Sequence, residues 1–228
     1  MIKAALDALR QGRFILLYDF DDRERETDFA IRADAVRPEH ILQMRKDGGG
    51  LICTAIHPLS AQKLGLPFAT DMLRCYNGVA GMVGEVPYDR KNRSSFSLWV
   101  NHRDTFTGIT DQDRALTINA IADQVRASMN GGGTDFSSQF RSPGHVAILR
   151  ADEQLLNRRR GQTELSVAMA LLAGITPAIA ICELLDDASG LALSKPDAQA
   201  YARRKGLVFV EGSDVLETWE ESGGHAAV

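Results

Sequence analysis

The sequence has few of the residues that cross-link small folds or hold structural zinc. Its 228 residues include only three cysteines, Cys53, Cys75 and Cys182. The count is odd and no two of them form a CxxC pair, so the sequence encodes neither a disulfide framework nor a structural zinc site. We therefore expect all three thiols to be reduced.

Long apolar runs are also missing, and so is an excess of positive charge. No uninterrupted apolar stretch approaches the ~20 residues of a membrane span. The first residues, MIKAALDALRQGR, lack the apolar block and cleavage site of a signal peptide. Lysine and arginine number 26 against 30 aspartates and glutamates. These features predict a cytoplasmic protein that does not bind nucleic acid through a basic face, so any bound anion must be held by local groups.

What the sequence does contain is enough apolar residues, 44% of the chain, to form a substantial core. Their spacing predicts helices over residues 2–11, 38–47, 111–130, 162–172, 196–204 and 214–221. Compact apolar runs predict strands over 14–18, 51–56, 95–100, 145–149, 178–184 and 207–210. We expect a long loop over 71–93. Helices and strands do not alternate regularly and no linker divides the chain, which predicts a single α+β domain over residues 1–228, with a mixed sheet flanked by helices.

The densest charged feature is the segment Asp19–Asp28, DFDDRERETD, which follows a predicted buried strand. It holds six carboxylates and two arginines within ten residues. A hard divalent cation such as Mg²⁺ would relieve the repulsion and leave coordination sites for substrate oxygens. The alternative is a solvated hairpin tip in which Arg23 and Arg25 neutralise their neighbours. Composition alone leaves both open, although the arginines exclude an EF-hand loop.

A basic turn, RRRGQTE over residues 158–164, stands where a loop is predicted to become a helix. Amide hydrogens at a helix start, a glycine, a hydroxyl and several guanidiniums together form a good phosphate site. The alternative is a basic surface turn in which Thr163 only caps the helix. Nucleic-acid binding by these arginines is less favoured, because no aromatic residues for base stacking are interleaved with them.

Three further side chains are candidates on their own. Cys53 lies four residues from His57 on a predicted strand, too far for a nucleophile and its base, so a buried structural thiol competes with any catalytic role. His145 could be catalytic or an ordinary partly buried histidine. Glu183 ends an otherwise apolar strand, which favours a polar pocket over a side chain that simply reaches water.

Taken together, the motifs resemble the 3,4-dihydroxy-2-butanone 4-phosphate synthase family of riboflavin biosynthesis. The resemblance rests on DFDDRERETD, MRKDGGGLICTAIHP, HRDTFTGITDQDRALTI, FRSPGHVAILRA, RGQTEL and AIAICELLDD, in the family's order and spacing. It covers nearly the whole length and implies the stand-alone form, without a fused cyclohydrolase domain. It also implies a homodimer with active sites at the interface.

The activity implied is a lyase reaction that converts D-ribulose 5-phosphate into 3,4-dihydroxy-2-butanone 4-phosphate and formate. It implies Mg²⁺ or Mn²⁺, one or two ions, assisting formation of an enediolate before a skeletal rearrangement. The implied substrate-binding residues are Arg23, Asp28, Arg159, Gly161, Thr163 and Glu183. The implied catalytic residues are Asp19, Glu26, Glu183, Cys53 and His145. The implied metal ligands are Glu24 and Gln162.

Two positions depart from the family pattern. Gln162 stands where relatives have a histidine metal ligand; its amide oxygen can bind Mg²⁺ but is neutral and discourages zinc-like metals. Arg25 stands where relatives commonly have glycine or asparagine, and it adds bulk and positive charge. These departures leave a second hypothesis, a weakly active or inactive paralogue that only binds a phosphosugar.

Overall fold

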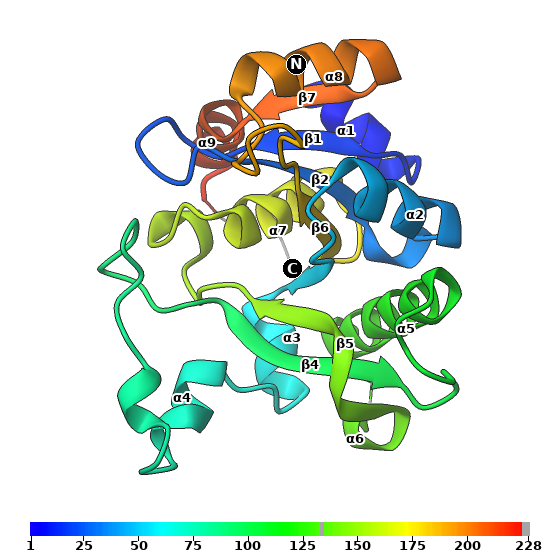
Figure 1. Ribbon diagram of the computed structural model, residues 1–228, viewed down its shortest axis with the longest axis vertical. Coiled ribbons are helices and arrows are strands. Elements are labelled where there is room, and N and C mark those ends of the chain that lie inside the picture. Colours follow the sequence, from blue (N-terminus) through cyan, green and yellow to red (C-terminus); the bar gives the residue numbers. More distant parts are fainter. Residues whose placement is uncertain (133–134, 225–228) are drawn as a thin grey trace.

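A seven-stranded mixed sheet runs through the molecule, with helices on both of its faces (Figure 1). The computed structural model describes residues 1–132 and 135–224. The strand order is β4-β5-β3-β6-β2-β1-β7. The β1–β7 and β3–β5 pairs are parallel, and the remaining neighbours pair antiparallel. This arrangement confirms the predicted α+β class.

The elements are bounded as follows. The strands are β1 (Ile15–Tyr18), β2 (Thr27–Arg32), β3 (Cys53–Ile56), β4 (Phe96–His102), β5 (Phe140–Arg150), β6 (Ala178–Glu183) and β7 (Val208–Glu211). The longer helices are α1 (Ile2–Arg10), α2 (Pro38–Asp47), α5 (Asp111–Met129), α7 (Gln162–Ala173), α8 (Lys195–Lys205) and α9 (Gly212–Glu221). Shorter ones are α3 (Pro58–Lys63), α4 (Ala69–Arg74) and α6 (Phe136–Gln139).

Each face of the sheet has its own hydrophobic core. Alternate side chains of a strand point to opposite faces, so Ile15 and Leu17 of β1 join one core while Leu16 joins the other. Helices α1, α7 and α9 cover the first face, and α2, α5 and α8 contribute to the second. Helix α7 is buried along most of its length and lies against the middle of the sheet.

The helix ends follow the local sequence. Thr110 caps α5, and its side chain accepts a hydrogen bond from the Asp113 amide, as the sequence predicts. Helices α7 and α8 end at Gly174 and Gly206, both in the left-handed conformation that glycine adopts without strain. Within residues 1–132 and 135–224, no helix combines the length and apolarity of a membrane span.

Three sequence-based expectations need correction. Strand β2 was not expected, because its first residues, Thr27 and Asp28, belong to the acidic segment and conceal its apolar alternation. The expected loop over 71–93 begins inside α4 and contains a short 3₁₀ helix, Ala80–Met82. Strand β5 is also longer than the predicted 145–149, because its first half pairs with the end of β4.

Candidate active site

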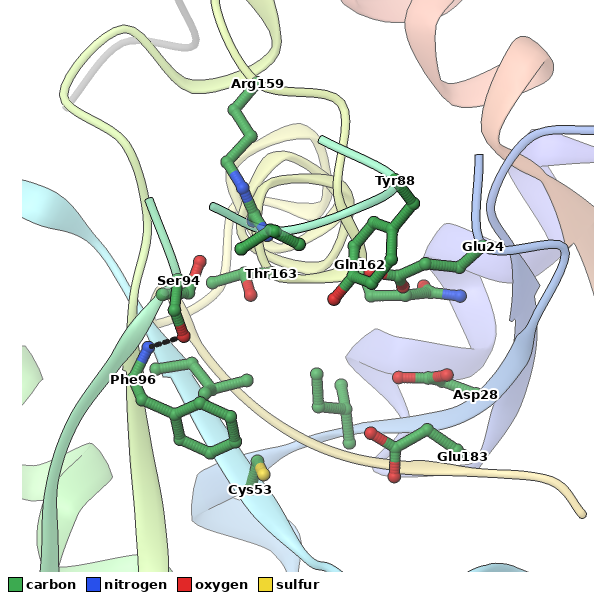
Figure 2. Close-up of a pocket in the computed structure, with 14 residues that line it drawn as sticks. Glu24, Asp28, Cys53, Tyr88, Ser94, Phe96, Arg159, Gln162, Thr163 and Glu183 are labelled. Atoms are coloured by element: carbon green, nitrogen blue, oxygen red, sulfur yellow. Dashed lines mark hydrogen bonds between the residues drawn. The ribbon is translucent and has the colours of Figure 1, made fainter. Parts of the chain in front are cut away.

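A cavity of about 100 Å³ opens on the face of the sheet covered by α7 (Figure 2). It is lined by Glu24, Asp28, Cys53, Val86, Tyr88, Ser94, Ser95, Phe96, Leu149, Arg159, Gln162, Thr163, Ile181 and Glu183. Carboxylates from the acidic segment thus meet the basic turn at the start of α7, although well over a hundred residues separate them in the chain.

The acidic segment forms the tip of the β1–β2 hairpin, and Asp19 organises it. The buried Asp19 carboxylate accepts hydrogen bonds from the Glu24 amide at 2.9 Å and the Glu26 amide at 3.0 Å. Burial raises the pKa of Asp19, while these amide hydrogens act in the opposite direction. Asp19 therefore shapes the loop from behind and does not line the cavity.

The hairpin tip is partly neutralised by its own arginine. Arg23 neutralises its neighbours, with its Nη1 atom 3.1 Å from the Glu24 carboxylate and 3.4 Å from that of Asp19. Glu24 nevertheless lines the cavity. Arg25 does not, because its side chain donates to the Asp21 carbonyl oxygen, and its backbone adopts φ 60°, the left-handed region that favours glycine or asparagine.

Acidic side chains crowd the floor of the cavity. Asp28 of β2 and Glu183 of β6 are direct cross-strand partners. Burial, and then the Glu183 charge, raises the pKa of Asp28 well above its usual value. Burial also raises the pKa of Glu183, and burial together with Glu24 and Glu183 raises the pKa of Glu26 to about 7. A carboxyl group with a pKa near 7, as at Glu26, can exchange protons near neutral pH.

Cys53 of β3 also lines the cavity, and it is 2% exposed. Burial, and then the charges of Glu183 and Asp28, raises the pKa of the Cys53 thiol well above its usual value. The thiolate is therefore disfavoured, so Cys53 presents a neutral thiol to the cavity. His57 lies at the other end of β3, where its Nδ1 atom accepts a hydrogen bond from the Leu59 amide and caps α3.

The basic turn places its side chains around the start of α7. The Arg159 guanidinium, 10% exposed, pairs with the fully buried carboxylate of Glu164, which also accepts a hydrogen bond from the Asp152 amide. The N-cap of α7 is Gly161, so Thr163 does not cap the helix and lines the cavity instead. Glu164, which sequence reasoning missed, thus fixes the arginine beside the helix N-terminus.

Gln162 is held by main-chain contacts that leave its oxygen available. Its Nε2 atom donates to the carbonyl oxygens of Leu17 at 3.0 Å and Glu26 at 3.1 Å. Its Oε1 atom is buried and has no hydrogen-bond partner among the residues described, and the side chain lines the cavity together with Glu24. A buried oxygen without a donor is a natural ligand for a cation.

The donor set fits a hard divalent ion better than a soft one. In the described part of the chain, no three His, Cys, Asp or Glu side chains come together as a metal-holding group. One carboxylate from Glu24 and one amide oxygen from Gln162 match the few protein ligands that Mg²⁺ takes when water and substrate oxygens complete its shell.

Five of the predicted site residues do not line this cavity: Asp19, Arg23, Glu26, Gly161 and His145. His145 is exposed, and its ring and main-chain nitrogens contact the Asn101 side chain. Conversely, sequence reasoning missed Tyr88 and the residues Ser94 to Phe96, which also line the cavity. No local motif marks these residues, because their place at the cavity depends on contacts with residues far away in the chain.

Comparison with known proteins agrees with this geometry. Residues 3–218 match the family model described as 3,4-dihydroxy-2-butanone 4-phosphate synthase. A protein of that name from Archaeoglobus fulgidus is 53% identical over 223 residues, which cover 95% of this chain and 93% of the relative. Another from Methanosarcina acetivorans is 51% identical, covering 96% and 90%.

Solved structures give the same result. A crystal structure described as 3,4-dihydroxy-2-butanone 4-phosphate synthase in complex with two magnesium ions matches with a TM-score of 0.80 and 30% identity, covering 98% of both chains. A cation-free form matches with a TM-score of 0.79 and 28% identity, covering 97% of this chain and 98% of that one. The chain therefore belongs to the 3,4-dihydroxy-2-butanone 4-phosphate synthase family, as its motifs predict.

Proposed function

We propose that the protein converts D-ribulose 5-phosphate into 3,4-dihydroxy-2-butanone 4-phosphate and formate, using Mg²⁺ or Mn²⁺. The observation that carries this proposal is the shared cavity, in which Glu24, Asp28 and Glu183 face Arg159 and Thr163. One end offers carboxylates and an amide oxygen to a cation, and the other offers cationic and hydroxyl groups to a phosphate. A phosphorylated sugar joins these two requirements in one molecule.

The phosphate end orients the substrate. Arg159 donates from a guanidinium fixed by Glu164, and Thr163 adds a hydroxyl next to the amides that start α7. The helix N-terminus favours negative charge at the same point. Binding the phosphate there holds the carbon chain over the carboxylates, so that proton transfer becomes an intramolecular event.

The opposite end moves protons. A divalent ion held by Glu24 and Gln162, one or two ions in all, would polarise the sugar oxygens and acidify the adjacent C–H bond. Asp28, Glu26 and Glu183 would serve as the general acids and bases, since burial raises the pKa of all three carboxyl groups and brings that of Glu26 to about 7. Asp19 supports this group by holding the hairpin tip in place.

The geometry does not favour the inactive phosphosugar-binding paralogue. That hypothesis rested on Gln162 and Arg25. Gln162 still has an oxygen available at the cavity, and Arg25 lies outside the cavity.

We also propose that the protein is a homodimer whose active sites lie at the interface. The connection between β4 and α5 exposes Phe106, at 94%, and Ile109, at 51%. Apolar side chains this exposed are typical of surfaces that pair with another chain. His145 lies beside Asn101 at the end of β4, next to this connection, so its catalytic role remains a prediction that depends on the assembly.

The test is formate production. Purified protein is incubated with ribulose 5-phosphate and MgCl₂, and the formate signal is followed by proton NMR. Glu24→Gln should lower kcat by about a hundredfold or more, since it removes a charged metal ligand. Glu85→Gln, which removes an exposed carboxylate outside the cavity, should not change it. An absence of formate at every Mg²⁺ and Mn²⁺ concentration would exclude the proposal.

A further inference from the structure

The segment 83–93, here called the strap, lines part of the cavity through Val86 and Tyr88 and places an acid between two arginines. The Asp89 Oδ2 atom lies 3.6 Å from Arg159 Nε and 3.7 Å from Arg23 Nη2. All three side chains are largely buried, with exposed fractions of 15% for Asp89, 10% for Arg159 and 9% for Arg23. Asp89 therefore compensates the charge of both guanidiniums.

These ion pairs contain no hydrogen bond. Both distances exceed the usual limit of about 3.2 Å. Arg23 Nη2 and Arg159 Nε are buried nitrogens without a hydrogen-bond partner in the described residues. Two N–H donors thus converge on one carboxylate oxygen that is too far away to accept from either, and a buried donor left unpaired is destabilising. An anion with several oxygens would satisfy both donors better.

The remaining contacts of the strap explain how it could move. Near its end, Arg93 is anchored by the Phe68 ring at 3.7 Å and by Asp71 at 2.7 Å. Within the strap, Asn92 donates to the Asp89 carboxylate at 2.8 Å, and Tyr88 lies under the Arg23 guanidinium at 5.3 Å. Most of the other strap residues are exposed. The attachment of the strap over the cavity thus depends on Asp89 and Tyr88.

We propose that Asp89 is an internal anion that holds the strap closed on the phosphate site, and that a bound phosphate group displaces it from Arg23 and Arg159. This inference rests on the proposed function, since it takes Arg159 as a phosphate ligand. A phosphate dianion forms short, charge-assisted hydrogen bonds to guanidinium donors, so it replaces a contact that provides charge alone. Asp89 thereby weakens the binding of anions that cannot pair with both arginines.

The experiment measures binding of inorganic phosphate by calorimetry at constant ionic strength. Asp89→Asn keeps the size of the side chain and still allows a hydrogen bond with Asn92, but it removes the competing charge. It should tighten phosphate binding about threefold to fivefold, because an ion pair without a hydrogen bond is a weak competitor. Glu85→Gln removes the same charge from the same strap without contacting either arginine, and it should leave the dissociation constant unchanged.

A second measurement follows the strap itself by hydrogen–deuterium exchange. Asp89→Asn without phosphate, and the unmodified protein with phosphate, should both exchange faster over residues 84–92 than the unmodified protein alone. Equal or weaker phosphate binding in Asp89→Asn, or unchanged exchange in the strap, would overturn the inference. Arg159→Gln separates the two ideas. If it leaves phosphate binding intact, the proposed phosphate site is wrong, while the exchange data without phosphate still decide the role of Asp89.

Discussion

Among single residues, Gln162 bears most directly on how the site differs from its family pattern. Its two main-chain hydrogen bonds fix the amide plane, so the oxygen stays buried in the cavity wall next to Glu24. A neutral ligand held this firmly loses little entropy on binding a cation, which offsets its lack of charge. The glutamine is therefore compatible with a working magnesium site.

Replacing Gln162 with leucine should weaken Mn²⁺ binding on the order of tenfold, because the side chain keeps its size but loses the oxygen ligand. Electron paramagnetic resonance of free Mn²⁺ measures this without any turnover. Gln154→Leu is the matched control, since Gln154 is exposed and lies outside the cavity. Equal affinity in both variants would mean that position 162 does not touch the metal.

His57 gives a prediction about stability. Burial lowers the pKa of the His57 ring to about 4. The ring is 8% exposed, and in its neutral form it caps α3. The unfolded chain binds the proton with the ordinary pKa near 6.5. Above pH 6.5 the ring is neutral in both states, so His57 does not lower the free energy of unfolding. As the pH drops toward 4 that free energy should fall, by at most about 1.4 kcal/mol per pH unit from this residue.

His57→Asn tests that dependence, because asparagine is also a good N-cap but does not titrate. Urea unfolding at several pH values should give a shallower loss of stability between pH 6.5 and 4 for the variant. Above pH 6.5 the two curves should run parallel. If they also run parallel below it, His57 does not contribute to the acid sensitivity of the fold.

At the scale of elements, the start of α7 depends on the close approach of two arginine side chains to Gly161. A Cβ atom on Gly161 would lie 2.5 Å from Arg159 Nη1 and 2.9 Å from Arg23 Nη2. The backbone of Gly161 is extended, with φ −92°, so glycine is needed here for space and not for conformation. The two guanidiniums could not keep their positions around a larger residue.

Gly161→Ala should therefore raise KM for ribulose 5-phosphate about tenfold, since displaced arginines hold the phosphate poorly. The melting temperature should fall as well, because the displaced Arg159 Nη1 atom is the one that pairs with the buried Glu164 carboxylate. Gly78→Ala provides the control, as nothing lies within 4 Å of the added atom. Steady-state kinetics with both variants measures the difference, and an unchanged KM would show that the arginines tolerate the methyl group.

The elements also show where local sequence reasoning succeeds. Helices α7 and α8 were predicted nearly to the residue, because glycine stops and apolar faces act locally. Strand β2 was missed because its first two residues are polar but buried. The local sequence gives no reason to bury them, since the reason lies in the cavity and in the cross-strand neighbour Glu183. The role of the strap was missed because no local pattern shows which distant residues it contacts in the folded chain.

For the whole molecule, the prediction concerns assembly. Sedimentation should give about twice the 24.9 kDa of one chain. Phe106→Glu should shift the protein toward monomer and lower formate production with it, if the active sites lie at the interface. Leu191→Glu is the control, since Leu191 is an exposed apolar residue too, at 70%, but lies between β6 and α8. A fully active monomer would contradict the interface proposal.

The amino-acid sequence by itself determined the kind of chemistry available and most of the local structure. Helix ends, buried strands, the acidic segment and the basic turn follow from neighbouring residues, and their order identifies the family. Only the tertiary structure decided which of these side chains meet. Asp19 lies behind the cavity while Glu24 lines it, Gln162 keeps an oxygen available, and Asp89 lies between Arg23 and Arg159. The reason is physical: propensity and periodicity act over a few residues, whereas burial, pKa and ion pairing depend on groups far apart in the chain.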